Sequence, residues 1–306
     1  MSVFITLLIK IIPLYVLILL GYIAGKNLKA QKETIASILI YIIVPVVVFN
    51  SIISTKINIE LLMLPLIFFA SCSAIGLSFY AIGKGFFNDS TRNILAFAAG
   101  TANTGYFGVP VAIELFGEGC LTTVVMCIFG FTIFENSIGF FLTARGSHTV
   151  ADSIKKLLKL PTIYAFILGL IVNYSGVNLG ESYQAFTKNF IGAYTVSGMM
   201  LIGIALADMK SFKFDFWFLS LTLIAKFIIW PIVVLCIIFV DKNVFHLFTP
   251  FIYKIMFLMA IVPLAANTVA FATELKAQPQ KASLAVFIST LIALIYIPLL
   301  TSIFLI

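Results

Sequence analysis

Long apolar runs follow one another along almost the whole chain, with only short polar segments between them. They lie at about 3–25, 32–54, 61–83, 92–117, 121–144, 161–175, 188–208, 214–240, 251–274 and 281–305. About 20 apolar residues are enough for a helix to cross a bilayer. Only 10% of the residues are charged, whereas a soluble domain has about 25%. We therefore expect an all-α polytopic membrane protein with ten transmembrane helices, and neither a cytosolic enzyme nor a nucleic-acid binder.

Basic residues are concentrated in every second loop between these runs. One set of loops holds Lys26, Lys29, Lys32, Lys84, Arg92, Arg145, Lys155, Lys156, Lys159, Lys210, Lys213, Lys276 and Lys281, and the alternate set holds only Lys56, Lys188 and Lys242. Loops rich in Lys and Arg face the cytoplasm. We expect a multi-pass protein of the cell's inner (plasma) membrane with both termini outside. The start of the chain lacks the basic region of a signal peptide, so we interpret it as the first span.

The basic segment 145–160 divides the chain into two halves of five apolar runs each. Because five is odd, the halves must have opposite orientations in the membrane. Pro13 near the start of the first half is matched by Pro161 at the start of the second, and Pro65 by Pro231. We therefore predict two inverted five-helix repeats, 1–144 and 161–306, joined by a cytoplasmic linker at 145–160. Inverted repeats are characteristic of secondary transporters, whose substrate site lies between the halves.

The fourth and ninth runs contain residues that interrupt helices. The fourth has Asn103, Thr104, Gly105 and Pro110, and the ninth has Pro263, Asn267 and Thr268. Glycine adds backbone freedom and proline removes a backbone donor, and irregular backbone at this depth is tolerated only inside protein or beside a cavity. Helix N-termini at two such breaks favour an anion, so the pattern predicts a small anionic or polar substrate. The alternative is a simple proline kink with Asn103 bonded to a neighbouring helix.

These residues resemble the auxin efflux carrier family, which includes bacterial members and the plant PIN-FORMED carriers. The resemblance covers essentially the whole chain. Its motifs are Ile43–Asn50, Asn103–Pro110, Ala225–Pro231, Val262–Asn267, and Val286–Leu291 followed by Pro298. The spacing of seven residues from Asn103 to Pro110 is the most specific of them.

The resemblance implies a fold similar to bile acid:sodium symporters and sodium/proton antiporters. Helices 4 and 9 would be broken and cross each other, with the substrate carboxylate held beside the crossing. Spans 1, 2, 6 and 7 would form a scaffold, and spans 3–5 and 8–10 a mobile transport unit that moves like an elevator. The short linker resembles that of bacterial members, so we expect a small mono- or dicarboxylate rather than auxin. Plant relatives suggest a homodimer. In the ninth span the family's crossover proline corresponds to Thr268 of this chain. The family's site is therefore assigned here only to Asn267 and its surroundings.

Each polar residue inside the other spans has a functional interpretation and a structural one. Glu135 is either a proton-coupling carboxylate, or part of a cation site with Asn136, or a protonated acid in a structural hydrogen bond, because a charged acid at this depth is costly. Lys226 either neutralises a substrate carboxylate or pairs with Glu135, or its stem reaches toward an interface. Asn50 either lines the site from the scaffold or bonds a neighbouring helix.

Other classes of function have less support in the sequence. The histidines, His148 and His246, lie in loops, and no motif of a hydrolase or metalloprotease is present. The four cysteines have no metal-site spacing, so we expect no metal and no cofactor. The sequence thus favours a secondary active transporter that binds a small organic anion at the crossing, with protons as the coupling ion. A uniporter, a channel or a sensor for another small anion is the alternative.

Overall fold

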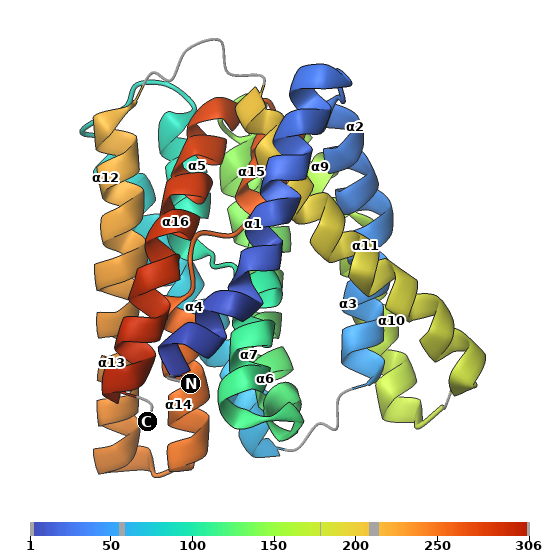
Figure 1. Ribbon diagram of the computed structural model, residues 1–306, viewed down its shortest axis with the longest axis vertical. Helices are drawn as coiled ribbons and strands as arrows, with labels where there is room; N and C mark the ends of the chain where they lie inside the picture. The colour runs from blue at the N-terminus through green and yellow to red at the C-terminus, as the bar shows by residue number, and fades with distance from the viewer. Residues whose placement is uncertain (1–2, 55–58, 178, 208–213, 305–306) are drawn as a thin grey trace.

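The computed structural model describes residues 3–54, 59–177, 179–207 and 214–304, and all regular structure in them is helical (Figure 1). The first half contains α1 (Val3–Asn27), α2 (Lys32–Ile38), α3 (Val44–Ile53), α4 (Ile59–Gly83), α5 (Thr91–Gly100), α6 (Val109–Phe116), α7 (Leu121–Phe134) and α8 (Phe140–Ala144). The second half contains α9 (Val150–Leu158), α10 (Pro161–Ser175), α11 (Gly180–Ala207), α12 (Phe216–Ile224), α13 (Trp230–Val240), α14 (Pro250–Ile261), α15 (Asn267–Glu274) and α16 (Pro279–Phe304).

Short turns of other helix types join several of these elements. The π-helical turns are η1 (Leu39–Ile43), η2 (Thr104–Gly108), η4 (Glu135–Gly139), η5 (Ala225–Ile229) and η6 (Asp241–Phe245), and η3 (Glu118–Cys120) is a 3₁₀ turn. Three of the π-turns, η1, η2 and η5, run directly into helices whose second residue is proline: Pro45, Pro110 and Pro231. Because proline has no N–H to donate, the preceding turn widens instead of keeping the regular hydrogen-bond ladder.

The expected all-α polytopic architecture is present. In the described residues, six helices are long and apolar enough to cross a membrane, or up to seven if the bent pair α9 and α10 counts as one. The fourth and ninth apolar runs are not among them because each is interrupted. One span begins earlier than predicted: α11 starts at Gly180 instead of 188, since a helix continues through polar residues such as Glu181 and Gln184 that a hydropathy pattern does not include.

The helices form two groups, which are joined by α1 and by a direct contact of α11 with α16. Figure 1 shows α12, α13 and α16 on the left and α2, α3, α10 and α11 on the right, with α1 running obliquely in front. On the right, α3 packs along α10, and the Asn173 side chain donates to the Ile52 carbonyl at 2.8 Å. Elsewhere α4 packs against both α5 and α7.

The contact of α1 with α11 depends on glycines. A Cβ on Gly203 would lie 1.9 Å from the Ile18 carbonyl oxygen, and one on Gly21 would lie 2.1 Å from the Met200 oxygen. The two backbones therefore touch without intervening side chains, as small residues permit between membrane helices. This contact fixes α1 to the group on the right of Figure 1.

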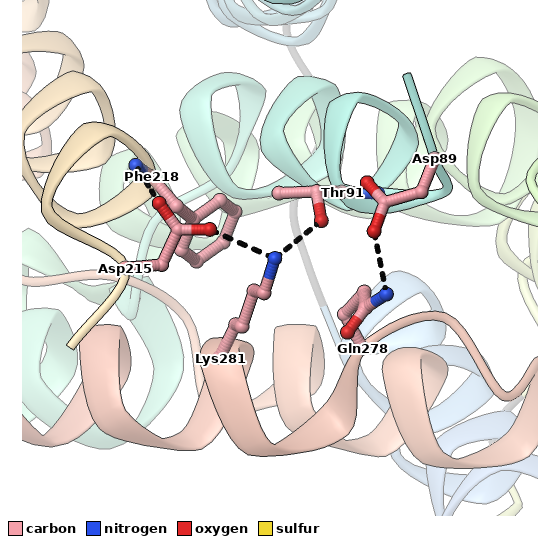
Figure 2. A network of polar contacts seen from close by, with 6 residues as sticks. All are labelled: Asp89, Thr91, Asp215, Phe218, Gln278 and Lys281. Atoms are coloured by element: carbon pink, nitrogen blue, oxygen red, sulfur yellow. Dashed lines mark hydrogen bonds and ion pairs between the residues drawn. The ribbon is translucent and has the colours of Figure 1, made fainter. Parts of the chain in front are cut away.

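A polar network ties together the loop before α5 and the starts of α5, α12 and α16 (Figure 2). The Lys281 ammonium lies 2.8 Å from a carboxylate oxygen of Asp215 and donates to the Thr91 hydroxyl at 2.7 Å. Asp215 also accepts from the Phe218 N–H and so caps α12. Gln278, at the other end of the network, donates to Asp89 at 3.0 Å. These contacts hold α12 and α16 in a fixed position relative to α5.

Candidate functional site

The helix breaks predicted in the fourth and ninth apolar runs are present. In the fourth run, α5 ends at Gly100, the backbone is extended at Thr101, and helix resumes from Thr104. In the ninth run, α14 ends at Ile261, the backbone of Val262 is extended, and α15 begins at Asn267. Both interruptions lie between long apolar segments, where water does not satisfy the freed backbone groups.

The two breaks touch each other, and the protein supplies partners for their backbone. The Asn103 N–H donates to the Pro263 carbonyl at 2.8 Å, which joins one break directly to the other. The Leu264 N–H donates to the Ser289 hydroxyl of α16 at 3.1 Å. At the end of α5, the Ala99 carbonyl accepts from the Trp230 indole at 2.7 Å. The irregular backbone is therefore held in place by hydrogen bonds within the protein.

Glu135 connects the two breaks through its side chain. It is buried on the π-turn η4, with 5% of its surface exposed. One carboxylate oxygen accepts from the Thr101 hydroxyl in the first break. The other accepts from the Asn267 amide at 2.8 Å, at the start of α15. The same amide lies 3.4 Å from the Tyr194 hydroxyl of α11. The Glu135 carboxylate thus links the two broken helices by one hydrogen bond to each.

A cavity of about 340 Å³ lies directly beside these groups. Its polar lining residues are Ser51, Asn103, Thr104, Thr132, Glu135, Asn136, Tyr194, Thr195 and Asn267. The other lining residues are glycine or apolar, among them Leu14, Val48, Ile128 and Phe129. None of the described residues that line it is a lysine, arginine or histidine. An anion bound here would therefore depend on amides, hydroxyls and helix N-termini rather than on a basic side chain.

Along the second span the cavity lies beside α3. Along α3 its lining runs from Val44 to Ser51, near the end of that helix. Near the opposite end of the same span, the Glu274 carboxylate accepts from the hydroxyls of Ser37 and Tyr41 at 2.8 and 3.1 Å. Tyr41 and Ser51 are ten residues apart, about 15 Å along a helix. The Glu274 contact is therefore near the other end of this span from Ser51.

The structure brings together most residues predicted for the site. Asn103, Thr104, Gly105, Glu135, Asn136 and Asn267 all line the cavity. Pro263 supplies the carbonyl that joins the breaks. Thr268 is buried behind Asn267 and is not a lining residue. Pro110 is the second residue of α6, but its side chain lies outside the described part of the chain.

Two predicted residues lie elsewhere. Asn50 lines a separate cavity of about 320 Å³ between α3, α10 and the start of α11. Lys226 is fully buried on η5, and its ammonium lies 4.9 Å from the centre of the Trp230 ring. It is not one of the lining residues of the large cavity, and its stem does not reach toward an interface.

Two residues at the site, Thr101 and Tyr194, were not predicted from the sequence. Thr101 stands between Gly100 and Asn103, so its position within the glycine-rich interruption was a signal for a break residue. Tyr194 lies within an ordinary apolar helix with no motif around it. Only the packing of α11 against the second break brings its hydroxyl to Asn267.

Comparison with known proteins identifies the class to which this architecture belongs. The family described as membrane transport protein matches residues 148–301. An uncharacterized transporter of Methanocaldococcus jannaschii is 28% identical over 228 residues, which are 71% of this chain and 74% of the relative. An uncharacterized transporter of Methanothermobacter thermautotrophicus is 24% identical over 298 residues, or 94% and 95% of the two chains. The chain belongs to the membrane transport protein family, that of the auxin efflux carriers, and is a multi-pass transporter rather than an enzyme.

Proposed function

We propose that this protein is a secondary active transporter that carries a small organic anion, a mono- or dicarboxylate, by alternating access. The substrate would bind where the two breaks meet, in the cavity lined by Asn103, Thr104, Gly105 and Asn267. In the proposed orientation the Ser51 end of the cavity faces outward and the Glu274 contact lies on the cytoplasmic side. The observation that carries the proposal is the hydrogen bond between the two interruptions, beside a cavity, in opposite halves of the chain.

The chemistry of the breaks supports an anionic substrate. A new helix begins at each break, at Thr104 and at Asn267. The first N–H groups of a helix have no acceptor within it, and its N-terminus carries a partial positive charge. Both starts line the same cavity. A carboxylate placed there would lie at the positive ends of two helices and beside the Asn103 side chain, without a buried basic residue.

Glu135 supports proton coupling. It lines the same cavity as the proposed anion, and two negative charges in a site of low polarity repel each other strongly. Binding of the anion therefore favours the protonated form of Glu135, so that anion and proton would move together. The alternative is a structural role, in which Glu135 only links Thr101 to Asn267.

The arrangement of the helices supports alternating access. The cavity is lined on one side by α3 and α11 and on the other by α7 and the breaks. These correspond to the proposed scaffold of spans 1, 2, 6 and 7 and the transport unit of spans 3–5 and 8–10. In this state α15 of the transport unit packs on α2 of the scaffold. A movement that separates α15 from α2 would open the site toward the other side.

The experiment is counterflow in proteoliposomes with a panel of short mono- and dicarboxylates and an amino acid as the negative control. We expect saturable exchange of at least one carboxylate. In Asn103→Ala its apparent affinity should fall by about 10- to 100-fold, the loss of one hydrogen bond to a charged group. Asn189→Ala is the matched control, because Asn189 lies exposed on α11 outside the cavity. No exchange by any carboxylate would refute the substrate class, and a linear, non-saturating flux would indicate a channel.

Proton coupling has its own test in the same vesicles. Glu135→Gln should keep exchange in counterflow, because a neutral amide resembles the protonated acid. It should lose uptake driven by a proton gradient. Gradient-driven uptake that persists in a folded Glu135→Gln variant would leave Glu135 with the structural role.

A further inference from the structure

The short helix α9, which follows α8 and precedes α10, has a face that the protein does not cover. Val150, Ile154 and Leu158 follow one another at intervals of four residues, so they share one side of the helix. Their exposed fractions are 49%, 45% and 57%. The neighbouring side is the one that packs on the protein, through the buried Ser153 and the half-buried Leu157. Only part of the apolar surface of α9 is therefore covered by the rest of the protein.

The side of α9 away from this stripe is basic. Lys155 and Lys159 are exposed and Lys156 is half-buried, and Arg145 precedes the helix. Asp152 is the one acidic residue between 145 and 160, and its N–H donates to the Thr149 hydroxyl at the helix start. An exposed apolar stripe beside a row of lysines is the pattern of a helix that lies in the membrane interface.

The chain around α9 places it at the membrane surface. The preceding span, Leu121–Ala144, is long enough to cross a bilayer. The following helix, α10, has 15 residues, about 22 Å in length, which is shorter than the hydrocarbon core of about 30 Å. The chain bends by 44° between α9 and α10. Because α10 alone is too short to cross the core, α9 continues from its start at an angle of 44° and carries the chain toward the bilayer surface.

We infer that α9 is a lipid-binding element: Val150, Ile154 and Leu158 insert among the acyl chains, and Lys155, Lys156 and Lys159 bind anionic headgroups. The partner is a lipid surface with negative charge, because the uncovered stripe requires an apolar phase and the lysines beside it require an anion. The inference does not depend on the transported substrate, and a failure of the counterflow experiment leaves it intact. Since α9 connects the two halves of the chain, the lipid would fix the linker between them.

The first test locates the stripe. A spin label is attached to Ile154→Cys in a Cys236→Ser background, because Cys236 is the exposed cysteine. The full-length protein is placed in bilayers of phosphatidylcholine with one third phosphatidylglycerol. We expect the label to collide with oxygen more than with a water-soluble nickel complex. A label at Asp152→Cys, on the opposite side of the helix, should show the reverse.

The second test measures the headgroup preference of the detergent-solubilised full-length protein with fluorescent phosphatidylglycerol and phosphatidylcholine. A lysine near an anionic surface contributes about fivefold to binding, so the preference for phosphatidylglycerol should fall by at least tenfold when Lys155, Lys156 and Lys159 are changed to Gln. The control changes Lys26, Lys29 and Lys84 to Gln, which are exposed lysines in and after the ends of α1 and α4, and should keep the preference.

Three results would overturn the inference. Equal nickel accessibility at Ile154→Cys and Asp152→Cys would place the stripe in water. Protection of the Ile154→Cys label from both reagents would place it against a protein surface, such as a second copy of the chain. An unchanged headgroup preference in the triple variant would remove the role of the lysines.

Discussion

The contact of Glu274 with Ser37 and Tyr41 should determine how the protein divides its time between two states. It joins the end of α15, on the proposed transport unit, to α2 and η1, on the proposed scaffold. A hydrogen bond to a charged group contributes about 1.5–3 kcal/mol when it is shielded from water. All three side chains are half-buried, so we discount each bond to about 1 kcal/mol. Together they favour the observed state by about 2 kcal/mol, or about 30-fold.

Glu274→Ala removes both bonds, and the equilibrium between the two states should shift by that factor. The reporter is Ser51→Cys in the Cys236→Ser background, since Ser51 lines the cavity at the end of the span away from the Glu274 contact, the end that faces outward in the proposed orientation. Its labelling rate with a membrane-impermeant maleimide should fall in Glu274→Ala. Tyr41→Phe and Ser37→Ala should each produce a smaller decrease, and Tyr41→Phe should add nothing to Glu274→Ala.

Glu181→Gln is the matched control, because Glu181 is an exposed acid at the start of α11. The reasoning is refuted if the labelling rate is unchanged in a Glu274→Ala variant whose melting temperature equals that of the unchanged protein. It is also refuted if Glu181→Gln has the same effect, because the change would then come from net charge and not from the contact.

Three further predictions concern stability. Gly203→Ala should lower the melting temperature in detergent, because its Cβ would overlap the Ile18 carbonyl and overpacking costs about 1–3 kcal/mol, whereas Gly192→Ala, which meets open space, should not. Trp230→Phe should destabilise by about 1–3 kcal/mol by leaving the Ala99 carbonyl without its donor, and Trp217→Phe, at an exposed position, should be nearly neutral. Burial acts to raise the pKa of Asp89, but hydrogen bonds from Thr91 and the charge of Lys281 outweigh it and hold this pKa below its ordinary 3.8. The ionised Asp89 therefore stabilises the fold above pH 3.8, and this stabilisation is lost as the pH falls through and below that value. The free energy of unfolding should consequently fall less steeply with acid in Asp89→Asn than in the unchanged protein.

The spans and their interruptions could be predicted from the sequence because they depend on local chemistry. Apolar runs of about 20 residues allow one structure in a bilayer, and Pro110 and Pro263 cannot continue a helical ladder. Asn103 and Asn267 stand beside these interruptions in the sequence, so their place at the cavity followed from the breaks. The ten-span count and the inverted repeat stay predictions.

Contacts between distant segments were beyond the sequence. The Tyr194 hydroxyl reaches Asn267 only because α11 packs beside α15. Asn50 faces a different cavity because its side of α3 turns toward α10 and α11, and hydropathy gives no rotation for an entirely apolar helix. The sequence placed Lys226 at mid-span. It did not show that Lys226 packs on Trp230, because the side of this apolar helix that faces lipid could not be predicted.

The positions of Glu135 and Lys226 bear on the charge that the proposed transport unit carries. Glu135 bonds Asn267 at the start of α15, where the helix dipole is positive. Lys226 packs on Trp230, which bonds the carbonyl end of α5, where the dipole is negative. If both groups are charged, the empty unit is balanced, and a bound monocarboxylate adds one negative charge that a proton on Glu135 cancels. Moving an uncompensated charge through a potential of 100 mV changes the free energy by about 2.3 kcal/mol. Uptake of a monocarboxylate with one proton should therefore not respond to a potential set by potassium and valinomycin, whereas strong acceleration by that potential would show that Glu135 does not take up the compensating proton.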